Sequence, residues 1–275
     1  MRKPRCSLLP SASIDLSGRV TTAVAIALFA GCGDPTAAPP SALNSPTVAP
    51  SGEIALYAVA PVPSEFSWSQ GQSAKLLGSA ADRVCYLTYV AGDFDGSTEW
   101  VGITISLGKW WLTGGSARSG VNAKARCIPV SSYGAEVSLA QFHSHDQKYL
   151  NGYSCGFTRL GGRFNSSQDQ VRILPDGSPA QWPRILYVSS WGGYVEGRVR
   201  CITSPVQITS PVGWFGSGTL VTLASTASPW TCFLTGMRGP FEGSGDWIFA
   251  FKGTSVWYLW GDPHPDRYAA GSCVK

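Results

Sequence analysis

Three segments of the chain share one pattern, in which the same residue types recur at the same distance from a cysteine. Each segment has a Thr three residues after its cysteine, a Gly after seven, a Phe after nine and an acid after fourteen. Self-similarity at a fixed spacing indicates tandem repeats, each of which is one unit of supersecondary structure. The recurring residues are Cys85/Cys155/Cys232, Thr88/Thr158/Thr235, Gly92/Gly162/Gly239, Phe94/Phe164/Phe241 and Glu99/Asp169/Asp246.

The composition of the repeats predicts an all-β fold. Charged residues make up only 14% of the chain, there are 32 Gly and 11 Trp, and short apolar runs alternate with turn residues. No long stretch has helical periodicity, and short apolar runs between turn residues are typical of strands. We therefore predict three tandem antiparallel β repeats of about 70 residues, in residues 54–135, 136–207 and 208–275. They are expected to pack with pseudo-threefold symmetry, with three serial modules as the alternative.

Four or five strands are expected in each repeat. A Trp recurs in the first and in the fourth expected strand of repeats 1 and 3, whereas repeat 2 offers other apolar residues there. These positions hold Trp68, Trp214 and, as a looser counterpart, Phe142 in the first strand, and Trp110, Trp257 and either Ile185 or Leu186 in the fourth.

The first 31 residues have the composition of a secretory signal peptide. Basic residues precede Val20–Ala30, which is an apolar run of small residues. This run is about 11 residues long, whereas a transmembrane helix needs about 20. A basic region followed by a short apolar region directs a chain to export and is then removed. The basic residues are Arg2, Lys3, Arg5 and Arg19.

The signal ends in Leu28-Phe29-Ala30-Gly31-Cys32, which resembles the lipobox of bacterial lipoproteins. Phe29 departs from that pattern, because Leu is commoner there. The resemblance implies that Cys32 becomes a lipid-carrying N-terminus. It also implies an extracytoplasmic protein anchored to the membrane of the cell envelope, at the outer membrane or the cell surface. The alternative is an ordinary signal peptide cleaved near Ala30. Residues 32–53 are rich in Pro, Ala and Ser and are predicted to form a disordered tether.

The cysteines agree with export. Of the eight, Cys6 and Cys32 belong to the leader and its end, and the remaining six lie two in each repeat. An even set in an exported chain indicates a disulfide framework, although six cysteines allow 15 pairings. Zinc binding is the competing interpretation, but the chain has no Cys-x-x-Cys spacing. The repeat symmetry predicts the pairs Cys85–Cys127, Cys155–Cys201 and Cys232–Cys273.

Repeats 1 and 3 share tryptophans that repeat 2 lacks. Trp100 and Trp247 directly follow the recurring acid, where repeat 2 has Gln170. Exposed aromatic faces mark binding surfaces, and Trp suits stacking on sugar rings. The alternatives are that these rings are buried against a neighbouring repeat and that the acids satisfy backbone donors. The predicted ligand-binding residues are Trp100, Trp110, Trp247 and Trp257, with Glu99 and Asp246 orienting hydroxyl groups.

Several other classes of activity lack the residues that they need. Without the leader the chain has 17 basic and 16 acidic residues and no basic cluster, so no nucleic-acid partner is predicted. It has no nucleophile-elbow, phosphate-binding or dinucleotide-binding glycine motif, and no cofactor and no metal site are predicted. Two metal interpretations are alternatives: a hydrolase site with His143, His145 and His264, and a calcium loop at Asp93–Glu99.

The favoured expectation is a non-enzymatic binding lipoprotein of the cell envelope, with carbohydrate or another surface ligand as its partner. A structural or protein-interaction lipoprotein and an extracytoplasmic hydrolase are the alternatives. The repeat pattern resembles modules of uncharacterised secreted and surface proteins of bacteria, and this resemblance implies no particular activity.

Overall fold

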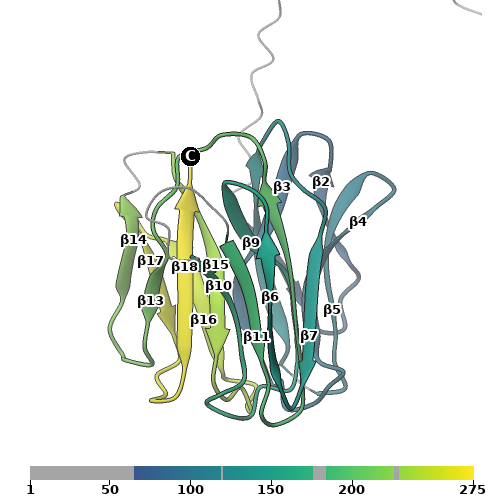
Figure 1. Ribbon diagram of the computed structural model, residues 1–275, viewed down its shortest axis with the longest axis vertical. Helices are drawn as coiled ribbons and strands as arrows, with labels where there is room; N and C mark the ends of the chain where they lie inside the picture. Colours follow the sequence, from purple (N-terminus) through teal and green to yellow (C-terminus); the bar gives the residue numbers. More distant parts are fainter. Residues whose placement is uncertain (1–64, 119, 176–183, 226–228) are drawn as a thin grey trace, which may run out of the picture. The chain divides into compact units, whose positions relative to one another are not determined.

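The computed structural model describes residues 65–118, 120–175, 184–225 and 229–275. The signal peptide, Cys32 and the tether predicted for residues 1–53 lie outside the described residues. Within the described part, the chain forms β-strands joined by turns and loops. Each repeat supplies six strands rather than the four or five expected. Figure 1 shows that the strands lie side by side with their axes roughly aligned.

The strand boundaries follow the repeats. Repeat 1 forms β1 (Phe66–Ser69), β2 (Lys75–Ser79), β3 (Arg83–Ala91), β4 (Trp100–Ser106), β5 (Lys109–Gly115) and β6 (Asn122–Pro129). Repeat 2 forms β7 (Val137–Phe142), β8 (His145–Leu150), β9 (Ser154–Gly162), β10 (Gln170–Pro175), β11 (Arg184–Ser189) and β12 (Tyr194–Ile202). Repeat 3 forms β13 (Val212–Trp214), β14 (Val221–Ser225), β15 (Thr231–Arg238), β16 (Trp247–Lys252), β17 (Val256–Gly261) and β18 (Tyr268–Val274).

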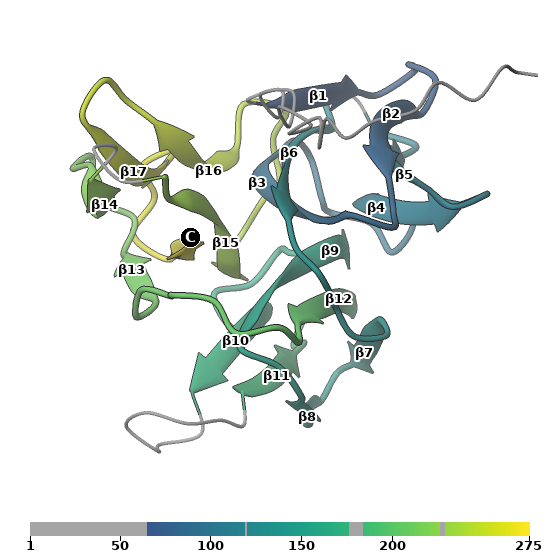
Figure 2. The same cartoon turned by 90° about the horizontal axis from the view of Figure 1, so that it is seen from above.

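The strands form three antiparallel sheets of six strands, and each sheet combines half of one repeat with half of another. Named by the repeats that they join, the 1/3 sheet has the order β1-β6-β3-β16-β17-β14, the 1/2 sheet β2-β5-β4-β9-β12-β7 and the 2/3 sheet β13-β18-β15-β10-β11-β8. Each repeat forms a lobe, and the three lobes surround a common centre (Figure 2). The predicted all-β fold with pseudo-threefold packing is confirmed. Serial modules are excluded, because every sheet crosses from one repeat to another.

One disulfide lies inside each repeat and joins directly opposite residues of two neighbouring strands. The pairs are Cys85–Cys127 between β3 and β6, Cys155–Cys201 between β9 and β12, and Cys232–Cys273 between β15 and β18, as predicted. Each bridge closes a loop of 41 to 46 residues. In the chain-entropy account a loop of this size stabilises the fold by roughly 4 kcal/mol. Three disulfides are typical of an oxidising, extracytoplasmic compartment.

The recurring threonine marks a β-bulge in every repeat. The pairing register shifts at Thr88 in β3, at Thr158 in β9 and at Thr235 in β15. A bulge adds one residue to one strand and bends it, so the cysteine end of each strand departs from the course of the remainder. The hydroxyl groups of Thr88 and Thr158 donate to Glu65 Oε1 at 3.4 Å and Glu136 Oε2 at 3.0 Å.

The recurring phenylalanines form a closed ring of backbone hydrogen bonds around the centre. The N–H of Phe94 donates to the carbonyl of Phe241, that of Phe241 to Phe164, and that of Phe164 to Phe94, each at 2.6 Å. All three side chains are fully buried, and the ring of Phe164 packs edge-on at 6.3 Å from each of the other two. Each repeat therefore donates one hydrogen bond to one neighbour and accepts one from the other.

The recurring glycines add a second circle of hydrogen bonds beside the first. Each donates its N–H to the carbonyl of the acid in a neighbouring repeat, Gly92 to Asp246 at 2.9 Å and Gly162 to Glu99 at 2.7 Å. Gly239 completes the circle through Asp169 at 3.0 Å. The three glycines have φ between +99° and +118°, which is a conformation that residues with a Cβ rarely adopt. Glycine recurs here because the backbone must turn and approach its neighbour closely.

At the level of the disulfides the centre is filled unequally. The residue after the first cysteine is Tyr86 in repeat 1, Gly156 in repeat 2 and Phe233 in repeat 3. The rings of Tyr86 and Phe233 lie 4.5 Å apart, and a Cβ at Gly156 would lie 2.6 Å from Tyr86 Cγ. Gly156 thus makes room for two aromatic rings where three would not fit.

Within each lobe, two half-sheets face each other over an apolar core. Trp68 and Trp214 fill this core from the first strands of repeats 1 and 3, opposite Ala123 and Ala269. The register places Leu139 at the same position in repeat 2, opposite Gly197. The predicted counterpart Phe142 is therefore wrong, because Phe142 lies three residues later, at the end of β7, and is exposed.

Replacing Gly92 with Ala tests the glycine circle. The added Cβ would lie 2.6 Å from Val121 Cα, and φ is +118°. We expect the free energy of unfolding to fall by about 2–5 kcal/mol, from backbone strain plus overpacking. Gly71→Ala is the control, because φ is +83° but no atom lies within 4 Å; it should cost only about 1–2 kcal/mol. Equal losses in urea denaturation of the two variants would contradict the packing role of Gly92.

The burial of Tyr86 leads us to predict that the protein loses stability at alkaline pH. Burial raises the pKa of Tyr86 well above its ordinary value of 10.0. The folded state then keeps a proton that the unfolded chain releases, so this contribution is complete below pH 10 and is lost as the pH rises above it. Tyr86→Phe should raise the pH of alkaline unfolding, measured by circular dichroism. Tyr149→Phe, at an exposed ring, is the control. An unchanged unfolding pH in Tyr86→Phe would contradict the prediction.

Candidate functional site: an aromatic face on one sheet

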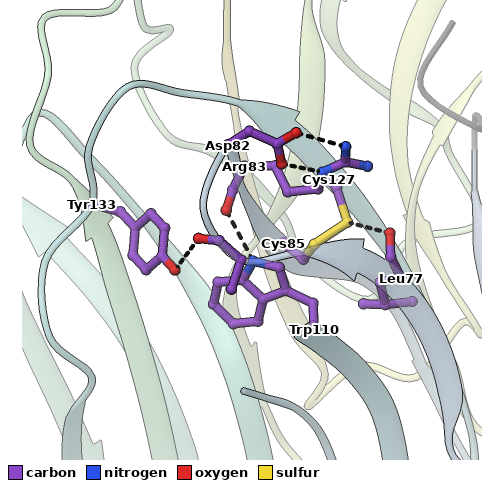
Figure 3. The surroundings of a disulfide bond; sticks show 8 residues. Leu77, Asp82, Arg83, Cys85, Trp110, Cys127 and Tyr133 are labelled. Atoms are coloured by element: carbon purple, nitrogen blue, oxygen red, sulfur yellow. Dashed lines mark hydrogen bonds and ion pairs between the residues drawn. A yellow bond between two sulfur atoms is a disulfide. The ribbon is translucent and has the colours of Figure 1, made fainter. Parts of the chain in front are cut away.

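Two of the predicted ligand-binding tryptophans are core residues. Trp110 and Trp257 are buried, so neither ring is available to a ligand. Figure 3 shows Trp110 next to the Cys85–Cys127 disulfide, with its indole N–H donating to the carbonyl of Arg83 at 2.9 Å. The prediction failed here because β5 and β17 alternate between the two faces of a sheet, and these positions point inward.

The repeat 2 counterpart of these tryptophans is Arg184, rather than Ile185 or Leu186 as expected. Trp110 pairs with Ile105, Trp257 with Lys252 and Arg184 with Pro175, at the same position of each hairpin. Arg184 is buried, and burial lowers the pKa of its guanidinium.

Arginines pack on the two buried indoles from a neighbouring repeat. The guanidinium of Arg200, in repeat 2, lies 5.5 Å from the Trp110 ring, and that of Arg126, in repeat 1, lies 4.9 Å from the Trp257 ring. Repeat 3 has Ser272 at the equivalent position, one residue before the closing cysteine. Repeat 2 in turn has Arg184 in place of the tryptophan. The Trp110–Arg200 and Trp257–Arg126 contacts join neighbouring lobes.

The recurring acids hold the loops of their own repeats. The carboxylate of Asp169 accepts four backbone N–H groups, among them Ser166 at 2.9 Å and Trp191 at 2.7 Å. Asp246 accepts the N–H of Glu242 at 2.8 Å and pairs with Arg267 at 2.7 Å.

Glu99 is buried and accepts the N–H of Ala117 at 3.4 Å. The structure thus gives Glu99 and Asp246 contacts inside the protein, which fits the alternative that the acids satisfy backbone donors.

Trp100 and Trp247 are half-buried and lie on the outward faces of their strands, whereas the next residues, Val101 and Ile248, are buried on the inward faces. They belong to different sheets, however, because β4 lies in the 1/2 sheet and β16 in the 1/3 sheet. The Trp100 ring is covered by the guanidinium of Arg159 at 4.0 Å. The structure therefore does not assemble the four predicted tryptophans into one surface.

The 1/3 sheet instead carries an aromatic outer face that the sequence reading missed. On β16 and β17 the residues alternate between buried and half-buried, and the half-buried ones are mostly aromatic. Tyr89 extends this set onto β3, since it pairs with Phe249 across the join between repeats 1 and 3. We call this set the aromatic face; it consists of Tyr89, Trp247, Phe249, Phe251, Tyr258 and Trp260.

The rings of the aromatic face contact one another. Phe249 packs edge-on against Tyr89 at 5.2 Å and parallel to Phe251 at 5.1 Å. Phe251 lies 5.5 Å from Tyr258, and Trp247 packs edge-on against Trp260 at 5.0 Å. Aromatic pairs with these spacings stabilise one another, so the face is a preorganised surface rather than a set of separate side chains.

The equivalent positions of the other two sheets are mostly not aromatic. Each of those sheets has one aromatic residue at the four positions that hold Phe249, Phe251, Tyr258 and Trp260. The pairing registers give Gly102, Thr104, Trp111 and Thr113 in repeat 1, and Arg172, Leu174, Ile185 and Tyr187 in repeat 2. The concentration of rings on one sheet is therefore not required by the repeat architecture.

An ion pair between Lys124 on β6 and Glu65, directly before β1, borders the aromatic face. The ammonium of Lys124 lies 4.5 Å from the Phe249 ring and 5.5 Å from the Tyr89 ring, and it pairs with Glu65 at 3.3 Å. Burial raises the pKa of Tyr89 above its ordinary value of 10.0. Its hydroxyl, protonated at neutral pH as in any tyrosine, can donate a hydrogen bond. The face thus combines apolar rings with a hydroxyl, a cation and a carboxylate.

The histidines take part in local contacts. His143 Nδ1 lies 2.7 Å from the carbonyl of Trp191, and His264 Nδ1 accepts the N–H of Asp266 at 3.2 Å. In the described part of the chain, no three His, Cys, Asp or Glu side chains form a group that could hold a metal ion. The described part of the chain also contains no helix that is long and apolar enough to cross a membrane.

Comparison with known proteins adds no family to this description: no family model matches the chain, and no curated protein matches it.

Proposed function

We propose that the protein is a non-enzymatic binding protein of the cell envelope and that its aromatic face binds carbohydrate. The observation that carries the proposal is the set of six half-buried aromatic side chains on the outer face of the 1/3 sheet. Apolar patches on a protein surface mark binding sites, and each of these six rings is partly exposed.

The chemistry of the face suits a sugar better than a wholly apolar ligand. Sugar rings have apolar C–H faces that pack on aromatic rings, and hydroxyl groups that need donors and acceptors. The Tyr89 hydroxyl and the Lys124–Glu65 pair provide such groups beside the rings. Because the rings already contact one another, little side-chain entropy would be lost on binding.

The place in the cell is part of the proposal. Cys32 would carry lipid, as the lipobox resemblance implies, and residues 32–53 would connect the folded part to the membrane. The three disulfides support an extracytoplasmic location.

A protein-interaction role is the second candidate, and exposed aromatics elsewhere favour it. Phe142, Trp191 and Phe215 are 66%, 67% and 72% exposed, at the end of β7, in the loop after β11 and in the loop after β13. They lie away from the aromatic face as defined here, so variants at the two places separate the candidates.

Trp260→Ala tests the proposed function. Removing one ring of the aromatic face should weaken binding on a glycan array about five- to tenfold, since a lost aromatic contact costs about 1 kcal/mol or more. Tyr187→Ala is the matched control, because Tyr187 holds the equivalent position on the 2/3 sheet; it should bind as the unchanged protein does. Both variants should keep the circular dichroism spectrum of the parent.

Two results would overturn the proposal. One is the absence of glycan binding by the unchanged protein. The other is binding that Trp260→Ala and Tyr187→Ala weaken to the same extent. Co-purification of a protein that Phe142→Ala or Trp191→Ala releases would favour the second candidate instead.

A further inference from the structure

A polar cavity lies at one end of the aromatic face. Its volume is about 340 Å³, within the range of small-ligand sites. It is lined by the end of β1, the start of β6 and the loop that precedes β6. The lining residues are Ser69, Gln70, Ala117, Arg118, Gly120, Val121 and Asn122.

The pairing register connects this cavity to the aromatic face. Ser69, Asn122, Ala91 and Trp247 lie in one row across β1, β6, β3 and β16. The next row contains Lys124, Tyr89, Phe249 and Trp260. Asn122 and Lys124 are two residues apart on β6, so their side chains lie on the same face of the sheet. The cavity therefore lies one row beyond the aromatic rings on the same sheet, with the buried Ala91 between Asn122 and Trp247.

Several hydrogen bonds hold the loop wall of the cavity in place. Gln70 Nε2 donates to the carbonyl of Ser116 at 3.1 Å, and the N–H of Arg118 donates to Ser116 Oγ at 2.8 Å. The buried Glu99 accepts the N–H of Ala117. Glu99, predicted from the sequence to contact a ligand, thus acts as a positioning residue for this wall.

The polar groups of the cavity match a sugar that carries a carboxylate. Ser69 offers a hydroxyl group, and Asn122 offers an amide whose Nδ2 also donates to the carbonyl of Gly120; such groups can bind sugar hydroxyls. Arg118 is the one charged residue among the lining residues, and its side chain is 52% exposed.

The Nε of Arg118 pairs with Asp95 at 3.0 Å, and this ion pair orients the guanidinium. A guanidinium binds carboxylates through paired hydrogen bonds. No acid is among the residues that line the cavity, and Asp95, which pairs with Arg118, lies outside that lining.

We propose that this cavity binds an acidic sugar unit of the glycan whose neighbouring units lie on the aromatic face, and that Arg118 selects the carboxylate. This inference rests on the proposed function and specifies its ligand as an acidic glycan. A neutral sugar would fill the same space without bringing a carboxylate to the guanidinium, which would keep Asp95 as its partner.

The test compares oligogalacturonate with its methyl ester, in which methylation of the carboxyl groups removes their charge, beside other matched acidic and neutral pairs on one array. We expect the unchanged protein to bind the acidic member of a pair at least tenfold more tightly. Arg118→Gln should remove this preference, because it lowers the affinity for the acidic member of the pair to that for the neutral one. Lys109→Gln removes the same charge at an exposed position in β5 and should keep the preference.

The outcomes separate the two proposals. If acidic and neutral sugars bind equally, or if Arg118→Gln keeps the preference, the acidic-sugar inference is overturned while glycan binding that depends on Trp260 still stands. If no glycan binds, the proposed function fails and the inference fails with it. If Lys109→Gln loses the preference as Arg118→Gln does, the effect is overall charge, and the assignment to Arg118 is overturned.

Discussion

The circle of hydrogen bonds among Phe94, Phe164 and Phe241 is the contact on which the rest of the structure depends. Each residue donates to one neighbouring repeat and accepts from the other, so the circle closes only when all three are present. A piece with two repeats would leave a buried N–H and a buried carbonyl unmatched, which is costly. The sheets impose the same condition, because each repeat supplies half of two sheets and alone would expose unpaired strand edges.

The sequence predicted the parts of this fold that every repeat must share. The cysteine pairs follow from symmetry, and the recurring glycine needs a positive φ in all three repeats. The sharing of sheets between repeats could not be predicted, because it depends on contacts between strands far apart in the chain. The bulge at Thr158 and its equivalents also escaped the sequence analysis, since a bulge leaves the residue pattern of a strand unchanged.

The site was predicted less well because similarity between repeats is a guide to architecture rather than to function. Trp110 and Trp257 recur because they fill equivalent cores, and Glu99 recurs because it holds a loop. The aromatic face lies where the repeats differ, as Phe249 stands where repeats 1 and 2 have Gly102 and Arg172. The alternation of Trp247, Phe249 and Phe251 was visible in the sequence and could have indicated this face.

Hydrogen exchange at the amides of Phe94, Phe164 and Phe241 tests most directly whether the three repeats fold as one unit. These amides should exchange with the same free energy of opening, and only through global unfolding, because opening any one repeat breaks the whole circle. Exchange of one amide at a much lower free energy than the other two would show that a repeat opens alone. That result would contradict the account of a closed circle holding the fold together.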